Sequence, residues 1–206
     1  MHALSLASEA KKLVIPVRYV ARGLVVHATS TALSADEVHV RSATPPPREV
    51  LIGFKLYFPD AVGIVNRSGV VADSFGDEFW AEFKDSDDIA RRRISELLWR
   101  REIGLRPCPR FHTNLHTIVR ESGQAKSEGY ITNISWSGAF VRLGALPRRG
   151  SVVELDISSL PELAGYHTVH AYVVHVAPRR GVGVQFIGGG DAFGSDLDRY
   201  LEQSGR

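Results

Sequence analysis

The sequence has a single cysteine, Cys108, among its 206 residues. One cysteine cannot form an intramolecular disulfide, so the class of small secreted domains held by disulfides is excluded, and a reducing compartment is indicated. No apolar run approaches the ~20 residues needed to span a bilayer. The first twelve residues lack a basic segment followed by an apolar core, so we expect no signal peptide and a cytoplasmic protein.

An excess of one charge is also missing, because 25 Lys and Arg residues face 23 Asp and Glu residues, for a net charge of +2. This charge is too small for a tail that binds polyanions in bulk, so any preference for nucleotides must come from local clusters. The apolar fraction of 44% and charged fraction of 23% are ordinary for a folded protein and argue against disorder. The length allows one large domain or two of about 100 residues.

The sequence does contain an internal repeat. SADEVHVRS, beginning at Ser34, resembles SWSGAFVRL, beginning at Ser135, and this match places Arg142 101 positions after Arg41. GVVADSFGDEFWAEF has the same length and rhythm as YVVHVAPRRGVGVQF, and their last residues are 103 positions apart. Self-similarity at a fixed spacing indicates duplication. We therefore predict two similar domains, residues 1–103 and residues 104–206.

Each half consists mostly of short segments rich in Val, Ile, Tyr and Phe, separated by turns that contain Gly and Pro, a pattern typical of small antiparallel barrels. The predicted strands lie near 13–20, 24–31, 37–41, 50–58, 62–73 and 78–84, and then at 115–120, 129–135, 138–143, 151–157, 168–176 and 181–187. Helices are expected at 85–101 and 191–203. The predicted fold is mainly β: two six-stranded antiparallel β-barrels, each followed by a C-terminal helix.

The two helices have candidate N-caps, at Asp85 or Ser86 in the first and at Asp191 or Ser195 in the second. The first helix carries five arginines around an apolar stripe, which is typical of the solvated face of an amphipathic helix. Steering of an anionic ligand and binding of nucleic acid are alternatives for these arginines.

Residues 105–111 read LRPCPRF, with two arginines four positions apart. Proline fixes its own φ near −65° and disfavours helix at the residue before it. Arg106 and Cys108 both precede a proline, so the segment is predicted to be an ordered, non-helical strap. The positions of Arg106 and Arg110 would then be functionally important.

Residues 133–138 read NISWSG within a predicted strand. Side chains alternate between the two faces of a strand, so Asn133 and Ser135 are expected to point the same way. Two short hydrogen-bonding groups beside a glycine at position 138 suit a small polar ligand. By itself the motif favours a simple bend or bulge between strands over a ligand site.

Together the strap and the NISWSG motif resemble the PilZ domain family. Nucleotide-binding members carry RxxxR just before the first barrel strand and D/N-x-S-x-x-G some 20–30 residues later. Here Arg106 and Arg110 form the first motif, while Asn133, Ser135 and Gly138 form the second. The closing strand GVGVQF is also similar, so the resemblance extends over about residues 105–203.

The resemblance implies binding of the bacterial second messenger cyclic di-GMP, with no catalysis. We also expect no cofactor and, from the spacing of the histidines, no metal. It assigns Arg106 and Arg110 to guanine and phosphate contacts. Asn133 and Ser135 would bind guanine or ribose groups, and Gly138 would provide clearance. The chemistry agrees, because the arginine fork matches both the O6/N7 edge of guanine and a phosphate, whereas lysine supplies only a charge.

The first half is interpreted as a degenerate PilZ-like domain that does not bind the nucleotide. Its RxxxR, formed by Arg18 and Arg22, lies inside or just after the first strand rather than before it. At the positions that align with the second motif it has Ala32, Ser34 and Glu37. Ala32 lacks the polar group, and Glu37 places an anion where a dianionic ligand would approach. Such a domain would contact a partner or pack on its neighbour, as in the flagellar-brake layout.

The strap is also the linker, so we predict that ligand binding changes the interdomain arrangement and passes a signal to a protein partner. That partner would belong to motility, polysaccharide or regulatory machinery. Two alternatives remain: a nucleotide-independent PilZ-type interaction module, and a nucleic-acid-binding protein that uses the arginine-rich helix, although nucleic acid is disfavoured. We see no acid/base or nucleophile constellation of an enzyme.

Three other features are given ordinary interpretations. Cys108 is taken as a bystander thiol, because no histidine stands beside it in the sequence. His112 and His116 would be ~13 Å apart on a strand, too far to share an ion. GGGDAFG, which ends at Gly194, lacks the βαβ unit of a dinucleotide site and is interpreted as a flexible connection.

Overall fold

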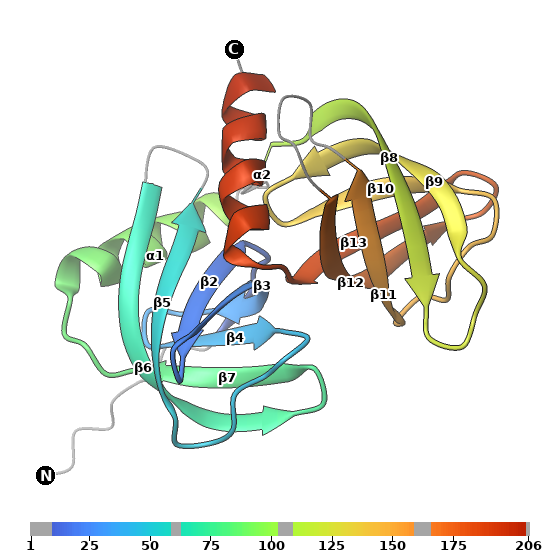
Figure 1. The fold of residues 1–206 in the computed structure, drawn as a ribbon. Coiled ribbons are helices and arrows are strands. Elements are labelled where there is room, and N and C mark those ends of the chain that lie inside the picture. Colours follow the sequence, from blue (N-terminus) through green and yellow to red (C-terminus); the bar gives the residue numbers. More distant parts are fainter. Residues whose placement is uncertain (1–9, 59–62, 103–108, 159–165, 205–206) are drawn as a thin grey trace, which may run out of the picture.

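The computed structural model describes residues 10–58, 63–102, 109–158 and 166–204. It consists of two β-barrels, with one helix following each (Figure 1). The predicted fold class is therefore confirmed. The domain boundary predicted after residue 103 falls within 103–108, which lie outside the described residues. No helix in the described ranges is both long and apolar enough to cross a membrane.

The N-terminal barrel closes with the strands in the order β2-β3-β4-β7-β6-β5, and a short outer strand, β1, adds to β3. Its strands are β1 (Lys11–Lys12), β2 (Pro16–Ala21), β3 (Leu24–Leu33), β4 (Glu37–Arg41), β5 (Leu51–Phe58), β6 (Gly63–Phe75) and β7 (Glu78–Phe83).

The C-terminal barrel closes in the order β8-β9-β10-β13-β12-β11, the same order strand for strand. Its strands are β8 (Phe111–Glu121), β9 (Ser127–Ser135), β10 (Gly138–Leu143), β11 (Val152–Ser158), β12 (Tyr166–Ala177) and β13 (Gly181–Gly188). All pairings in both barrels are antiparallel.

The two barrels share a β-bulge, a place where one strand has an extra unpaired residue. Between β3 and β4 the register shifts at Thr31, and between β9 and β10 it shifts at Thr132. These threonines are 101 positions apart, as the sequence repeat predicts. A bulge bends its strand at a defined point. Its presence at matching positions shows that the halves are copies of one fold.

The structure corrects one part of the alignment. β6 and β12 match at an offset of 102 residues, because Val71 and Val173 hold equivalent places in the sheet. Val71 pairs with Ala81 on β7, and Val173 pairs with Val184 on β13. The offset becomes 103 only in β7 and β13. The turn before β13 has three residues, Pro178–Arg180, whereas the turn before β7 has two, so the extra residue lies there.

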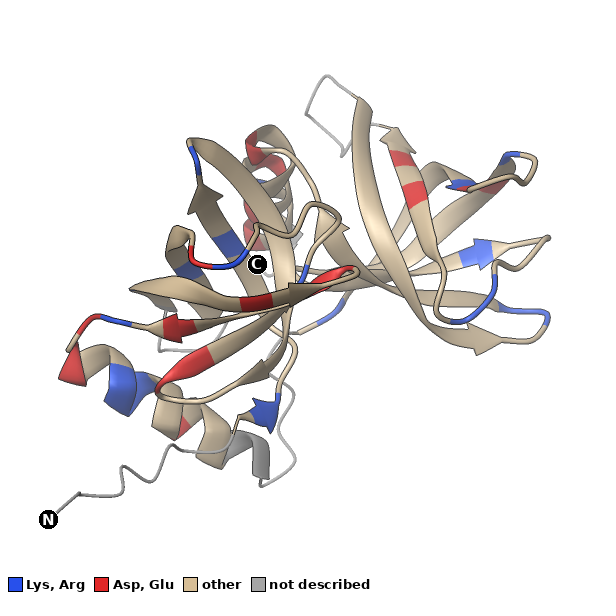
Figure 2. Ribbon diagram, turned by 90° about the horizontal axis from the view of Figure 1, so that it is seen from below, with Lys and Arg blue, Asp and Glu red and all other residues tan. Residues whose placement is uncertain are grey.

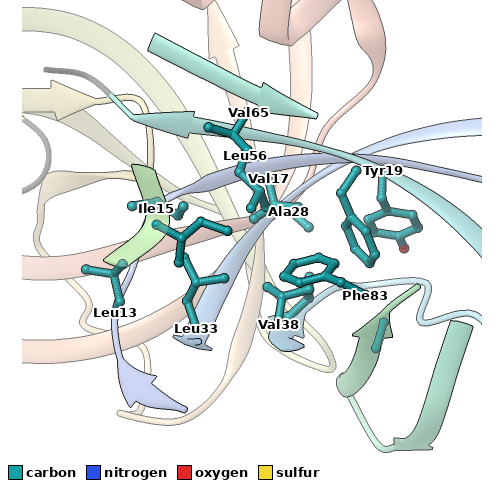
Figure 3. Packing of buried hydrophobic residues seen from close by; sticks show 14 of the residues in the cluster. Leu13, Ile15, Val17, Tyr19, Ala28, Leu33, Val38, Leu56, Val65 and Phe83 are labelled. Atoms are coloured by element: carbon teal, nitrogen blue, oxygen red, sulfur yellow. The ribbon is translucent and has the colours of Figure 1, made fainter. Parts of the chain in front are cut away.

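Alternation of apolar and polar residues builds each core. In β5 every second side chain is buried, and in β11 the same pattern holds. The N-terminal core gathers residues from every strand of the closed ring (Figure 3). Tyr19 is fully enclosed there, and its hydroxyl lies 2.7 Å from Ser42 Oγ and donates to the carbonyl oxygen of Thr44 at 2.8 Å.

Helix α1 (Asp88–Glu102) packs Ala90, Ile94 and two leucines into the N-terminal core. Its N-cap is Asp87, whose carboxylate accepts hydrogen bonds from the amides of Ile89 and Ala90. The predicted caps, Asp85 and Ser86, are therefore wrong. The Asp85 carboxylate accepts a bond from the amide of Ser68 instead, at 2.6 Å.

Helix α2 (Asp191–Ser204) lies between the two barrels and contacts both (Figure 1). One face, with Phe193, Leu197 and Leu201, belongs to the C-terminal core. The first turn also presents Asp191 to the N-terminal barrel, where its carboxylate lies 3.1 Å from the guanidinium of Arg18. The chain's last helix therefore joins the barrels as well as closing the second one.

The sequence predicts a flexible connection for the glycine-rich segment before and within α2, and this prediction is wrong. A Cβ at Gly194 would stand 1.8 Å from the His27 ring, and one at Gly188 would be 3.0 Å from Ala43. Gly189 accepts a backbone hydrogen bond from His27, and Ile187 accepts one from Ala43. The missing side chains let β13 and α2 lie directly against the N-terminal barrel.

Candidate functional site

A cleft of about 720 Å³ opens between the two barrels. Lys12, Thr31 and Arg41 form its N-terminal wall. The C-terminal wall consists of Arg110, the turn after β9, and the outer faces of β10, β12 and β13. The floor is held by Gln185, which is buried and whose side-chain amide donates across the interface to the hydroxyl of Thr29.

Three residues of the NISWSG motif, Ser135, Ser137 and Gly138, line this cleft, and Ser135 and Gly138 also have roles within the barrel. Ser135 is buried, and its hydroxyl donates to the carbonyl oxygen of Gly138 at 3.2 Å. A Cβ at Gly138 would stand 2.1 Å from the carbonyl oxygen of Val184 on β13. The glycine therefore permits close strand pairing, while its predicted role toward a ligand stays a prediction.

Of the two strap arginines, the described residues include only Arg110. Arg110 is exposed just before β8 and lines the cleft. Arg106 and Cys108 lie outside the described residues. Because Arg110 shares the cleft with Ser135 and Gly138, the two motifs meet in space at this position.

Asn133 lies in a side pocket of about 400 Å³ rather than in the cleft itself. The pocket is also lined by His112, His175 and Arg180. Phe140 and His175 line both spaces, so the pocket adjoins the cleft. The predicted site residues Arg110, Asn133, Ser135 and Gly138 thus border one two-lobed site.

The site is cationic. Lys12, Arg41, Arg110 and Arg149 line the cleft, Arg180 lines the side pocket, and no Asp or Glu is among the described residues that line either. Arg41 is already engaged, because its guanidinium pairs with two carboxylates and stacks on the ring of Tyr172 of the other barrel at 3.8 Å. Stacking across the interface fixes this wall of the cleft.

At the equivalent positions of the N-terminal barrel, Ser34, Glu37 and Arg18 are engaged with other groups of the protein. The Ser34 hydroxyl accepts hydrogen bonds from the amides of Asp36 and Glu37, each at 3.1 Å, and so fixes a turn. The Glu37 carboxylate lies 3.5 Å from His39. Arg18 is held by Asp191, and its Nε donates to His27 Nε2 at 2.9 Å.

His27 is enclosed under the first turn of α2. Burial, followed by the nearby positive charge of Arg18, lowers the pKa of His27 to about 4, and Asp191 opposes this shift. Because Nε2 accepts the bond from Arg18, the ring is neutral, with its proton on Nδ1. This polar cluster lies at the domain junction.

Sequence reasoning missed Lys12, Phe140, Arg149, His175 and Arg180, which the fold brings to the site. A local signal was available for two of them. The tetrapeptide PRRG occurs twice, ending at Gly150 and at Gly181, and it contributes one arginine to each space.

The solved structures that resemble the chain are distant. Borreliella burgdorferi PlzA in complex with c-di-GMP is 11% identical, with a TM-score of 0.41, 92% of this chain covered and 88% of that chain. Bacillus subtilis MotI, an inhibitor of motility, is 15% identical with a TM-score of 0.41 and coverages of 93% and 96%. Escherichia coli YcgR in complex with c-di-GMP is 12% identical with a TM-score of 0.36 and coverages of 92% and 83%. Likeness of this degree carries no argument about function.

No curated protein matches the sequence. The family model of the PilZ domain matches residues 105–203, which span the strap, the C-terminal barrel and most of α2. Residues 105–203 of the chain therefore belong to the PilZ domain family.

Proposed function

We propose that the protein is a cyclic di-GMP receptor that acts through binding and not through catalysis. One observation carries the proposal: Arg110, Ser135 and Gly138, from motifs far apart in the sequence, line one cationic cleft in a PilZ domain. Cyclic di-GMP has two phosphates and two guanines, and such a ligand needs cationic forks, hydrogen-bonding groups and flat surfaces for stacking.

The site offers each of these elements. Arg110 provides a guanidinium with no ion pair to another described residue. Asn133 provides an amide that can both donate and accept hydrogen bonds, in the side pocket. Phe140 and His175 provide rings between the two spaces. Arg106 is proposed to complete the site from the strap.

The finer part of the proposal is that binding changes the interdomain arrangement and so alters contact with a protein partner. Its support is that both barrels line the cleft, so ligand affinity depends on how they are placed. Small-angle X-ray scattering with and without cyclic di-GMP tests this part. An unchanged scattering curve at saturating ligand would refute the rearrangement and leave the receptor role intact.

The receptor role is tested by isothermal titration calorimetry with cyclic di-GMP. We expect saturable binding to the wild type and a loss of about tenfold to hundredfold for Arg110→Ala, since one charge-assisted contact contributes about 1.5–3 kcal/mol. Arg106→Ala should behave alike. Arg199→Ala is the matched control, because Arg199 is exposed on α2 and lines neither space.

A second candidate is a PilZ-type interaction module that does not depend on nucleotide. It is favoured by the structural roles of Ser135 and Gly138, which would preserve the motif without any ligand. Absence of heat from the wild type, together with recovery of the same protein partner with and without cyclic di-GMP, would select this candidate.

A further inference from the structure

Two exposed arginines border the site without belonging to either PilZ motif. Arg149 lines the cleft, and Arg180 lines the side pocket. Within the described residues neither makes an ion pair or a side-chain hydrogen bond, whereas Arg18, Arg41 and Arg120 all do. An unpaired guanidinium at the edge of a cavity retains its full capacity to bind an anion.

In the N-terminal barrel, an arginine at an equivalent position is paired with a carboxylate. Arg48 is the equivalent of Arg149, because Glu49 and Gly150, the residues that follow them, donate the same backbone bond to Val71 and Val173. The Arg48 guanidinium lies 3.7 Å from the carboxylate of Asp73.

The C-terminal barrel has no carboxylate at the equivalent position. The strand register makes His175 the equivalent of Asp73. His175 pairs with Gly183, and Asp73 pairs with Trp80, in each case directly after the same bulge. His175 cannot neutralise Arg149, and it lines the cleft beside it.

The two barrels also differ at the positions of two further carboxylates. In the N-terminal barrel Arg41 pairs with Asp77 and Glu78. Arg180 and Gly181 take their places before and at the start of β13. The cation that aligns with Arg41, Arg142, therefore has no acidic neighbour there, and Arg180 adds a further positive charge. Figure 2 shows Lys and Arg at the loop tips of this barrel.

The turns that carry the two arginines are held by defined backbone bonds. The amide of Arg180 donates to the carbonyl oxygen of Ala177 at 3.0 Å, and Arg179 between them has a φ of 61°. This conformation favours glycine and costs an arginine free energy. In the other turn Ser151 donates to Arg148 at 3.2 Å, and Gly150 has the positive φ. Each turn thus points one arginine of its pair to a cavity and leaves the other outside.

We propose that Arg149 and Arg180 are anion-binding residues of the ligand site, which take phosphate groups of a purine nucleotide at the two ends of the two-lobed cavity. The inference rests on the proposed function. It adds a basic rim that the family motifs do not contain, and the first barrel has three carboxylates at the positions equivalent to His175, Arg180 and Gly181.

The PRRG repeats supply matched controls. Arg149→Ala is compared with Arg148→Ala, and Arg180→Ala with Arg179→Ala, because each control removes the same charge from the same turn but lines neither space. Arg179→Gly is added, since glycine fits the positive φ and separates loss of charge from a change in the turn. Binding of cyclic di-GMP is measured by calorimetry at two salt concentrations.

We expect Arg149→Ala and Arg180→Ala each to weaken binding about fivefold to twentyfold and to lower its salt dependence. Arg148→Ala, Arg179→Ala and Arg179→Gly should stay within twofold of the wild type. Equal effects within each pair would overturn the inference, because they would show only a general attraction by net charge. If wild type and all variants fail to bind, the proposed function itself fails.

Discussion

The N-terminal and C-terminal barrels have the same strand order and the same bulges, yet they differ in the charges that they carry at equivalent positions. In the first barrel, arginines at the equivalent face are paired with Asp73, Asp77 and Glu78. In the second barrel His175, Arg180 and Gly181 stand at these positions. Carboxylates at these strand positions neutralise the arginines of the first barrel, and their absence from the second barrel leaves its arginines available to an anion.

The comparison also explains why the barrels are joined so closely. Gln185, Ile187 and Gly189 all bond to the N-terminal barrel from β13 or just after it. The outer face of β13 thus meets its neighbour at one end and lines the cleft at the other. The N-terminal barrel therefore contributes one wall of the cleft.

The largest effect is expected from a side chain at Gly138. The N-terminal barrel carries Glu37 at the equivalent position, whereas in the second barrel a Cβ would stand 2.1 Å from a carbonyl oxygen. Gly138→Ala should lower the free energy of unfolding by about 3 kcal/mol or more. Thermal unfolding followed by circular dichroism measures this loss.

Gly144→Ala is the control for that substitution, because its Cβ would meet nothing within 4 Å. It should unfold close to the wild-type temperature. Equal melting temperatures for the two variants would contradict the close strand pairing at Gly138.

The next largest effect concerns how the free energy of unfolding depends on pH through His27 at the domain junction. His27 is half-buried and neutral, with its pKa lowered to about 4, whereas the equivalent residue of the second barrel, Glu128, is exposed. The unfolded chain binds a proton to His27 near pH 6.5 and the folded chain only near pH 4. Stability should therefore be complete above pH 6.5 and fall as the pH drops toward 4, by at most about 3 kcal/mol.

Denaturant unfolding of the wild type and His27→Gln between pH 7.5 and pH 4 measures this effect. Glutamine keeps an acceptor for Arg18 but does not titrate, so the difference between the two proteins isolates His27. A difference that does not change with pH would show that His27 titrates normally.

A smaller effect should follow from restoring the acid of the first barrel. His175→Asp places a carboxylate beside Arg149, as Asp73 lies beside Arg48. Affinity for cyclic di-GMP should fall about tenfold, which corresponds to about 1.4 kcal/mol. The reciprocal change, Asp73→His, should leave the affinity unchanged, and calorimetry on both variants reports the outcome. Unaltered binding by His175→Asp would show that a carboxylate at this position does not control affinity for the nucleotide.

The smallest effect is expected from Arg48→Ala. The guanidinium and the Asp73 carboxylate are 3.7 Å apart and largely exposed, so the pair should contribute no more than about 0.5 kcal/mol to stability. A loss above 1 kcal/mol on urea unfolding would mean that the pairing supports the barrel rather than only neutralising its face.

Most of the fold could be predicted because its signals are local. Alternating residues such as those of β5 and β11 identify strands without knowledge of their neighbours, and the repeat fixes the number of barrels. The offset of the second repeat was wrong for β6 and β12 by one residue. A single insertion in a turn changes little in a sequence pattern, whereas hydrogen-bond register reveals it.

The site was predictable only where a motif marks it. Arg110, Ser135 and Gly138 come together as the motif requires, but Lys12, Arg149 and Arg180 reach the site through barrel closure and domain packing. The contact that makes Gly138 necessary lies on β13, which is adjacent only in the folded barrel. Likewise, no sequence pattern shows that α2 would present its first turn to the other barrel.

The central claim, that one copy of the fold binds cyclic di-GMP while the other does not, is tested most directly by NMR. Uniformly ¹⁵N-labelled protein is titrated with cyclic di-GMP, and amide shifts of equivalent residues in the two barrels are compared. We predict large shifts at Arg110, Ser135 and Gly138 and small ones at Ser34 and Glu37. Shifts of equal size in both sets, or none in either, would contradict the account.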